Sequence, residues 1–521
     1  MAVFLGLDCS TQSLTGLAID TERGEIIARG NVNFEKDLPE YASPNGVLPC
    51  DDPRRKRSNP LMWCAALDAL FAELSGNGLD LGRIAGISGS GQQHGSVYLN
   101  ADFTRTISSL PSSSSLAEIF EPSLSRKTSP IWMDSSTSVE TAEIAAAVGE
   151  RLRLDSGSAA IERFTGPQIR KFWKDDPSAY AETARVHLVS SFLSSILAGK
   201  DSPIDFGDGA GMNLLNLKTL QWDSEFAAAT APGIIGKLPP PAPSTTKLGT
   251  VSPYFAEKYG VADDAVCLVW SGDNPNSLVG VGASAPGTAV LSLGTSDTFF
   301  ASMDCPATDP DGCGHIFGNP GGGFMALICF VNGSLAREKI RDKHGLDWKG
   351  FDKAVLDAPP GNDGNMMLPY FEPEATPPIG KPGVRLHGSD DFISGRADAP
   401  RECRAIVESQ LVSVANHSKW ISSRLPFSKI RITGGASESS AIRSIAADVF
   451  QVDVEVISAT DSAALGAAMR AANAVEGVAF EELAAVFAGT VETIEPNGNN
   501  AGIYDRMGRE FADLERGNAD S

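Results

Sequence analysis

The stretch AVFLGLDCSTQSLTGLAI, residues 2–19, decides the fold class of this chain. Its hydrophobic pattern predicts an apolar strand over residues 2–7, a polar turn over residues 8–13 and a second strand over residues 14–19. A turn made of small hydroxyl residues and one aspartate, at the corner between two strands, provides backbone N–H groups that can hold an anion. The stretch therefore predicts both a local fold and a possible site.

The same order of features returns in the second half of the chain. Residues 288–293 form an apolar run, residues 294–297 (Gly-Thr-Ser-Asp) form a tight polar turn, and residues 298–302 continue in extended form. Helical and strand patterns alternate between and after these two units, which is typical of α/β proteins. We interpret the two units as a duplicated element, one for each of two lobes.

Composition excludes several classes of function. The 521 residues include 43 Lys and Arg against 65 Asp and Glu, and the net charge of −22 argues against partners such as nucleic acids or anionic membranes. The amino terminus has no basic segment before its apolar run, so we expect no secretory signal. The eight cysteines show no Cys-x-x-Cys pair, which favours a reducing cytoplasm. Cys313-Gly-His315 lacks matching ligands for a metal site.

Asp8, at the first corner, has two interpretations. Its carboxylate suits a Mg²⁺ ion bound to a nucleotide, which takes one or two protein carboxylates. Alternatively, it accepts hydrogen bonds from the N–H groups of its own turn, as aspartate often does. No Gly-x-x-x-x-Gly-Lys-[Ser/Thr] motif occurs, so ATP binding by a P-loop is excluded.

Two further strand ends carry polar groups. In residues 89–95, GSGQQHG, the spacing of the glycines and the extended pattern that follows disagree with a dinucleotide fingerprint. Gln and His94 beside glycines suit a sugar site, although a structural role for His94 stays open. Asp273, in Ser-Gly-Asp-Asn-Pro after the run at residues 266–270, suits a general base, and an Asx turn before proline is its alternative.

Taken together, these segments resemble the FGGY family of carbohydrate kinases and, within it, xylulose kinases of the eukaryotic type. The resemblance covers residues 3 to 475 and rests on the order and spacing of eight short motifs rather than on any one of them. The motifs are GLDCSTQ (6–12), GQQHG (91–95), WMDSST (132–137), ERFTG (162–166), DGAGMN (208–213), GDNP (272–275), SLGTSDT (292–298) and TGGAS (433–437).

The resemblance implies two actin-like (ribonuclease H-like) α/β lobes, as in actin, hexokinase and Hsp70, with ATP and sugar in a central cleft. Residues 1–282 would form the sugar-binding lobe, and residues 283–521 the nucleotide-binding lobe. Independently of the resemblance, the polar composition of the last forty or so residues predicts a peripheral tail. The ketose would contact His94, Arg163, Asp273 and Asn274, with Met133 and Asp134 nearby. ATP would contact Asp8, Thr11, Gln12, Gly294, Thr295, Ser296, Trp348, Gly434 and Gly435. Mg²⁺ would reach Asp8 mainly through ATP and water.

The implied reaction is ATP-dependent phosphorylation of D-xylulose at its C5 hydroxyl, with Asp273 as general base. A kinase for another ketose or polyol, such as ribulose or glycerol, is the nearest alternative, because a few pocket side chains can switch such a preference. A non-catalytic ATP-binding protein of the same fold is a further alternative, although such a protein has no need of the Asp273 carboxylate. The enzyme is expected to be cytoplasmic, and a monomer or a homodimer.

Overall fold

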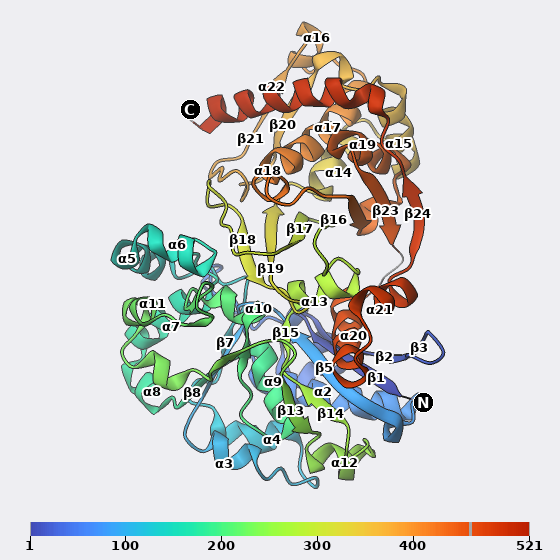
Figure 1. Cartoon of the computed structure of the whole chain (residues 1–521). Coiled ribbons are helices and arrows are strands. Elements are labelled where there is room, and N and C mark those ends of the chain that lie inside the picture. Colours follow the sequence, from blue (N-terminus) through green and yellow to red (C-terminus); the bar gives the residue numbers. More distant parts are fainter. Residues whose placement is uncertain (1, 458–460, 520–521) are drawn as a thin grey trace.

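The computed structural model describes residues 2–457 and 461–519 of the chain. It is a mixed α/β structure with two seven-stranded sheets, one from each half of the sequence. Figure 1 shows the first sheet in the lower body of the molecule and the second sheet running up into the upper body. The described residues contain no helix that is both long and apolar enough to cross a membrane.

The first sheet has the strand order β13-β14-β5-β1-β2-β3, and the short strand β15 also pairs with β5. β1 pairs with β2 antiparallel, whereas β5 runs parallel to β1, β14 and β15. The carboxyl ends of β1, β5 and β15 therefore meet at one edge of the sheet. The strands are β1 (Val3–Cys9), β2 (Ser13–Asp20), β3 (Glu25–Asn33), β5 (Ile84–Gly91), β13 (Lys247–Thr250), β14 (Val266–Leu268) and β15 (Ser271–Gly272).

The second sheet repeats this arrangement. Its order is β18-β19-β17-β16-β22-β23-β24, with β16, β17 and β19 antiparallel and with β22 and β23 parallel to β16. An antiparallel hairpin beside parallel strands occurs in both sheets, so the predicted duplication is confirmed. The strands are β16 (Thr288–Leu293), β17 (Asp297–Met303), β18 (His315–Gly318), β19 (Phe324–Phe330), β22 (Lys429–Thr433), β23 (Asp453–Ile457) and β24 (Thr490–Ile494).

Helix α2 (Pro60–Gly76) covers β2 and β3 of the first sheet. The Asn59 side chain accepts a hydrogen bond from the N–H of Leu61, and proline at the first helical position needs no hydrogen-bond partner for nitrogen, so the start of the helix is well defined. Leu70 of α2 packs directly on Gly16 and Gly30 of the two strands. The hydrophobic spacing within residues 61–74 predicts an amphipathic helix there, and α2 confirms it.

Helix α20 (Ser462–Glu476) follows the second sheet in sequence but packs on β1 and β5 of the first sheet. It also lies along α13 (Asp273–Gly280), and Figure 1 shows both helices between the two bodies. Buried alanines of α20, among them Ala464 and Ala468, share a hydrophobic cluster with Phe4 and Leu17 and with the buried face of α21 (Phe480–Phe487). Packing thus assigns both helices to the first sheet, and the boundary at residues 282/283 stays a prediction.

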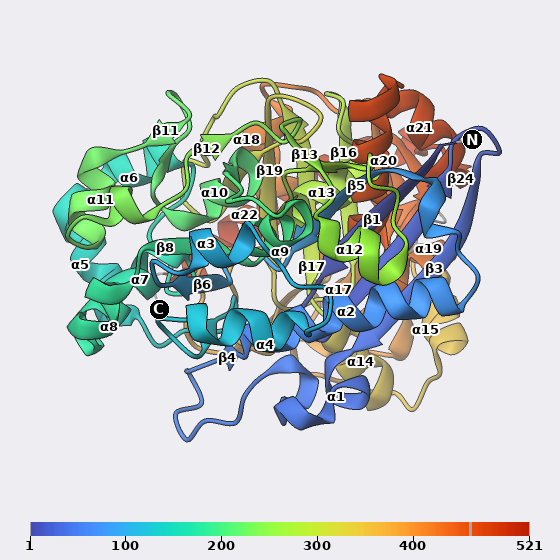
Figure 2. The ribbon, with the colours of Figure 1, turned by 90° about the horizontal axis from the view of Figure 1, so that it is seen from below.

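The remaining helices build a side wall on the first body and the layers of the second. Figure 2 shows α5, α6, α7 and α11 gathered on the side of the first body away from β3, where they have their own hydrophobic cluster. The longer helices are α5 (Ser138–Val148), α6 (Glu150–Ser156), α7 (Thr165–Asp175), α9 (Val189–Ala198), α11 (Ser224–Thr230), α12 (Pro253–Tyr259), α14 (Ser334–Lys343), α15 (Trp348–Asp357), α17 (Ala399–His417), α19 (Ser440–Phe450) and α22 (Ala501–Ala519).

The carboxy-terminal segment differs from the peripheral polar tail that composition predicts. It forms helix α22, which packs on α17. Tyr504, Met507 and Phe511 are buried in the main cluster of the second body, while charged residues occupy much of the outer surface of the helix. Apolar residues spaced three and four apart provide a buried stripe even when the average composition is polar.

We expect Gly6→Ala to destabilise the fold, because a methyl group at residue 6 would lie 1.9 Å from the carbonyl oxygen of Ala464 in α20. The obstructing atoms are backbone, so we expect a loss on the order of 2–4 kcal/mol in the free energy of unfolding. Gly76→Ala is the control: residue 76 has open space around it, and the change should stabilise by up to about 1 kcal/mol. Thermal unfolding compares the two variants, and equal midpoints would contradict the close contact.

Candidate active site

The carboxyl ends of β1, β5 and β15 bring together polar residues that are far apart in sequence. Asp8 lies near the end of β1, and the parallel register places Ser90 of β5 opposite it. The Ser90 hydroxyl donates a hydrogen bond of 2.7 Å to the Asp8 carboxylate. Asp273 directly follows β15, which pairs with β5 at Ser90 and Gly91. Sheet pairing therefore sets the positions of both carboxylates.

Asp273 is the first residue of α13 and is held on several sides. Its carboxylate accepts hydrogen bonds from the N–H of Asn274 at 2.9 Å, from the Asn274 amide at 3.2 Å and from the N–H of Gln93 at 3.4 Å. The Asn274 amide also donates to the Gln93 side-chain oxygen at 2.9 Å. Gln93 thus fixes both members of the Asp273-Asn274 pair, a role that single-sequence reasoning did not assign to it.

The two carboxylates have raised pKa values. The pKa of Asp8 rises to about 7, first because the surrounding protein desolvates it and then because of the charge of Asp273. Desolvation also raises the pKa of Asp273 to about 6, although the hydrogen bonds from Asn274 and Gln93 act in the opposite direction. A site that holds two such groups attracts a cation or a proton.

This donor set suits Mg²⁺ only as part of a nucleotide complex. No group of three or more His, Cys, Asp or Glu side chains able to hold a metal occurs within residues 2–457 and 461–519. Mg²⁺ usually keeps several waters and takes one or two carboxylates together with phosphate oxygens. The half-buried Asp8 fits that limited role.

His94 projects from the loop after β5 with a left-handed backbone, φ 72°, which is uncommon for a residue other than glycine. Its ring stacks on Phe164 at 4.3 Å between centroids. Its Nδ1 lies 2.9 Å from the carbonyl oxygen of Gly211, so Nδ1 carries the proton and donates. Burial and the nearby Arg163 charge lower the pKa of His94 well below its usual value. Nε2 therefore remains a hydrogen-bond acceptor.

The residues 132–134 are fastened to the first turn. The Trp132 indole donates a hydrogen bond of 2.8 Å to Thr11, next to the exposed Gln12. Met133 is half-exposed, whereas Asp134 is buried. The Asp134 carboxylate accepts hydrogen bonds from Lys56, Ser136 and Gln168, at distances from 2.7 to 3.0 Å. It holds three segments together, and a direct contact of Asp134 with a sugar stays a prediction.

The turn Gly294-Thr295-Ser296, between β16 and β17, is exposed and is held from below. The Gly294 carbonyl accepts a hydrogen bond from the N–H of Ser334, at the start of α14. Directly after the turn, Asp297 forms a two-pronged ion pair with Arg337 of α14, at 2.8 and 2.9 Å. Both side chains of this pair are buried. Sequence reasoning assigned no role to either of them.

A cavity of about 810 Å³ in the second body gathers several predicted nucleotide residues. Gly294, Thr295, Trp348 and Gly435 all line it. Gly434 lies beside it with φ 90° and approaches Leu293 so closely that a Cβ atom would lie 2.4 Å from the carbonyl oxygen of Leu293. Ser296, Gly434 and the first-turn residues are not part of the lining. The other lining residues are Leu293, Ser334, Glu338, Lys349, Phe351, Asp352, Lys353, Leu356, Ala436, Glu438, Ser439 and Ile442.

Trp348 stands at the rim of this cavity with 44% of its surface exposed. The Arg341 guanidinium stacks on it at 4.4 Å, and Phe351 meets it edge-on. One turn farther along α15, Asp352 accepts hydrogen bonds from the Ser439 and Ser440 hydroxyls, which fixes the segment after Gly435. Sequence reasoning missed Asp352, and its only sequence signal is a carboxylate on the same helix as Trp348.

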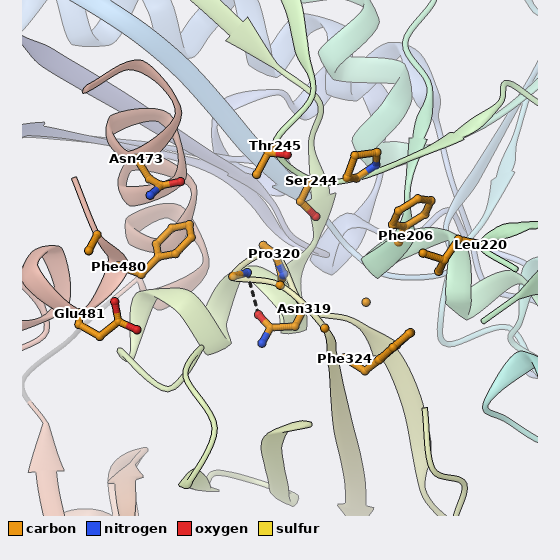
Figure 3. Close-up of a pocket in the computed structure, with 16 residues that line it drawn as sticks. Phe206, Leu220, Ser244, Thr245, Asn319, Pro320, Phe324, Asn473, Phe480 and Glu481 are labelled. Carbon is orange, nitrogen blue, oxygen red and sulfur yellow. Dashed lines mark hydrogen bonds between the residues drawn. The ribbon is translucent and has the colours of Figure 1, made fainter. Parts of the chain in front are cut away.

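A second cavity, of about 540 Å³, holds none of the predicted residues. Figure 3 shows it between the loop that joins β18 to β19 and the end of α20, with Phe206, Phe324 and Phe480 around it. The Asn319 side chain accepts a hydrogen bond of 2.8 Å from the N–H of Gly321 and so shapes the loop.

The two α/β lobes share one sheet topology, as the predicted actin-like fold requires. Carboxylates at the strand ends of the first lobe and a cavity beside the turn of the second are features of an enzyme that acts on small molecules. The FGGY family of carbohydrate kinases matches this chain in two parts: its N-terminal domain over residues 127–280 and its C-terminal domain over residues 289–475. The chain belongs to the FGGY family of carbohydrate kinases, as its motifs predict.

Relatives of known name support the same assignment. A xylulose kinase of Rattus norvegicus is 38% identical over 98% of this chain and 96% of its own, and xylulose kinase 2 of Arabidopsis thaliana is 39% identical over 91% and 87%. Among solved structures, a ligand-bound xylulose kinase of Lactobacillus acidophilus has a TM-score of 0.84 at 20% identity and covers 100% of this chain and 99% of its own. A Plasmodium falciparum glycerol kinase with ADP has a TM-score of 0.80 at 15% identity over 99% and 98%. The predicted two-lobed fold is confirmed.

We expect Arg337→Met to destabilise the second body by roughly 3–5 kcal/mol, because the buried Asp297 loses its partner. The double variant Arg337→Met/Asp297→Asn removes both charges and should regain most of the loss. Lys339→Met, on the same helix but in an exposed pair with Glu372, should change stability by less than about 1 kcal/mol. Thermal unfolding compares the three, and a double variant no more stable than the single one would contradict this account.

Proposed function

We propose that this chain transfers the γ-phosphoryl group of ATP to the C5 hydroxyl of D-xylulose, giving D-xylulose 5-phosphate and ADP. The observation that carries the proposal is the Asp273 carboxylate, fixed by Gln93 and Asn274 and with its pKa raised to about 6. A general base works best with a pKa close to the working pH. A binding protein of the same fold has no use for such a group.

The substrate is proposed from the relatives, because kinases of several different substrates share this fold and the fold alone does not identify the sugar. Solved structures named for gluconate and glycerol kinases have TM-scores of 0.83 and 0.80 to this chain. The relatives with 38–39% identity over most of the chain are xylulose kinases. At this level of identity, we expect this chain to act on the same sugar.

In the sugar subsite, some side chains would accept hydrogen bonds from the sugar hydroxyls and others would donate hydrogen bonds to them. His94 offers its Nε2 as an acceptor, because its Nδ1 donates to Gly211. Arg163 offers donors, and no carboxylate in the described part of the chain forms an ion pair with it. Asn274 would orient the reacting hydroxyl beside Asp273, with Met133 and Asp134 shaping the neighbouring wall.

In the nucleotide subsite, the two turns would face the phosphates from the two lobes. Gly294, Thr295 and Ser296 present backbone N–H groups on an exposed turn, and Trp348 offers an aromatic face at the cavity rim. Gly435 lines the cavity and has open space where a Cβ atom would lie, which leaves room for adenosine. Gly434 packs against Leu293 and so holds the Gly434-Gly435 segment beside the cavity. Across the site, Asp8, Thr11 and Gln12 would complete the set.

The reaction needs positioning and charge compensation rather than covalent catalysis. Asp273 accepts the proton of the C5 hydroxyl while that oxygen attacks the γ-phosphorus in line with the departing ADP oxygen. Mg²⁺, when bound with ATP, would offset charge on the phosphate oxygens. Asp8 would hold it through water, and the turn N–H groups would hold the equatorial oxygens. Closure of the two lobes would exclude water and so limit ATP hydrolysis.

A cytoplasmic location is part of the proposal. All eight cysteines are free, and Cys9, Cys64, Cys267 and Cys403 are buried in the cores. Free thiols that pack as apolar groups suit a reducing compartment.

The test is ADP release from Mg²⁺-ATP with D-xylulose, L-xylulose, D-ribulose, L-ribulose, glycerol and gluconate. We expect a strong preference for D-xylulose. Asp273→Asn keeps the shape of the side chain but removes the base, so kcat should fall by about 10²–10⁴ while ATP still binds.

Asp263→Asn changes an exposed aspartate of the same lobe and should leave kcat unchanged. Preference for another polyol would refute the substrate but keep the base. Near-normal turnover of Asp273→Asn would refute the base.

The raised pKa values predict an acid limb in the pH profile. A general base works only when ionised, and a raised carboxyl pKa extends the protonated form to higher pH. We therefore expect kcat/KM for ATP, at saturating sugar, to fall as the pH drops through about 7 to 6. The acid limb of the kcat profile should lie at lower pH than that of kcat/KM, because the cation bound with ATP favours the ionised carboxylates.

Ser90→Ala tests the assignment of this limb. The Ser90 hydroxyl lowers the pKa of Asp8, so its removal should move the limb to higher pH. Ser88→Ala is the matched control on the same strand: its buried hydroxyl has no hydrogen-bond partner among the described residues, and the titration of ATP affects both variants equally. Identical limbs in the two variants would contradict the assignment.

A further inference from the structure

His315 begins β18, the edge strand of the second sheet, yet its side chain contacts residues of the first half of the chain. Its Nε2 lies 3.4 Å from Nη2 of Arg163, and its Nδ1 lies 3.2 Å from the Ser158 hydroxyl. Its ring centroid is 5.5 Å from that of Phe164, on which His94 also stacks. The second lobe thus supplies one side chain to the wall of the sugar subsite.

The hydrogen-bond partners fix the tautomer of His315. A guanidinium can only donate, so Nε2 must accept the contact from Arg163 and cannot carry a proton. The neutral ring therefore has its proton on Nδ1, which donates to Ser158. Burial, followed by the charge of Arg163, lowers the pKa of His315 to about 3. His315 is a neutral acceptor throughout the working pH range.

Arg163 depends on this acceptor for its orientation. Its other contact is with the face of Phe164, at 6.0 Å from the ring centroid, and no ion pair holds it in the described residues. A long guanidinium side chain without a carboxylate partner keeps several rotamers, and a fixed acceptor restricts them. His315 supplies that restriction without neutralising the charge, as a carboxylate would.

β18 itself is fastened to the first lobe close to these residues. The N–H of Ile316 donates a hydrogen bond of 3.0 Å to the carbonyl of Gly157, next to Ser158. Farther along the strand, Gly318 meets Gly207 so closely that a Cβ atom at residue 318 would lie 2.8 Å from the Gly207 nitrogen. The position of His315 is therefore set by the contact between the lobes.

We propose that His315 is a positioning residue of the second lobe, which aims the Arg163 guanidinium at the ketose through its neutral Nε2. This inference rests on the proposed sugar-kinase function of the same site. It extends that function by making the sugar subsite complete only when both lobes contribute. Nothing in the sequence pattern around Cys313-Gly-His315 indicates this role.

Two amide substitutions separate the contacts of the ring. His315→Asn places its amide near the former Nδ1, so it keeps a donor for Ser158 but loses the acceptor for Arg163. His315→Gln reaches the former Nε2, so it can still accept from Arg163. We expect His315→Asn to raise KM for D-xylulose roughly tenfold, with kcat and KM for ATP within about twofold, because an interaction equal in ground and transition states changes KM alone. His315→Gln should stay within about threefold of the wild type.

A double-mutant cycle tests whether His315 acts through Arg163. Arg163→Met should raise KM for D-xylulose by itself, and adding His315→Asn should have no further effect. Ser158→Ala removes the partner of Nδ1 and should raise KM by a smaller factor. Thermal unfolding and ATP binding identify variants that fail to fold, and Ser158→Ala and His315→Gln remain informative if His315→Asn is one of them.

The outcomes distinguish this inference from the function on which it rests. A wild-type protein inactive on every sugar of the panel would refute the proposed function. A wild type active on D-xylulose, with His315→Asn unchanged in KM, would refute the inference alone. Equal defects in both amide variants, loss of kcat and ATP affinity together, or additive effects with Arg163→Met would also overturn the positioning role.

Discussion

The contact of helix α20 with β1 and α13 is the constraint on which the rest of the structure depends. At Gly6, Gly280 and Gly466 a Cβ atom would lie within 2 Å of a backbone oxygen, so the three elements touch main chain to main chain. Arg470 of α20, which is 2% exposed, donates hydrogen bonds to the carbonyls of Ser244 and Val269 and to the side chain of Asn276. A helix that follows the second sheet in sequence therefore ties together the strand ends of the first, and the two lobes share one framework.

This framework holds two carboxylates in a place where the protein shields them from water. Asp8 and Asp273 sit at parallel strand ends, where desolvation raises the pKa values of both and the charge of Asp273 further raises that of Asp8. Hydrogen bonds from Ser90, Gln93 and Asn274 limit the rise. Arg163 is the opposite case: it faces two neutral histidines instead of a carboxylate. The two carboxylates therefore attract a cation or a proton, whereas the Arg163 guanidinium keeps its donors for groups that can accept hydrogen bonds.

Much of the fold could be predicted because its signals are local. The strand–turn–strand units at residues 2–19 and 288–302, and helix α2, follow from hydrophobic periodicity and turn residues. The family resemblance also named four residues that line one cavity, although they lie far apart in sequence. The burial of α22 was not predicted, because an average polar composition hides an apolar stripe.

The sequence by itself determined the α/β class, the duplicated turns and the family, since each depends on residue types at fixed spacing. Only the tertiary structure decided that α20 covers the first sheet, that Gln93 holds Asp273 and Asn274, and that His315 reaches Arg163 from the other lobe. These are contacts between segments separated by more than a hundred residues. They form because strand register and close helix packing bring distant parts of the backbone together. A pattern of neighbouring residues carries no information about such contacts.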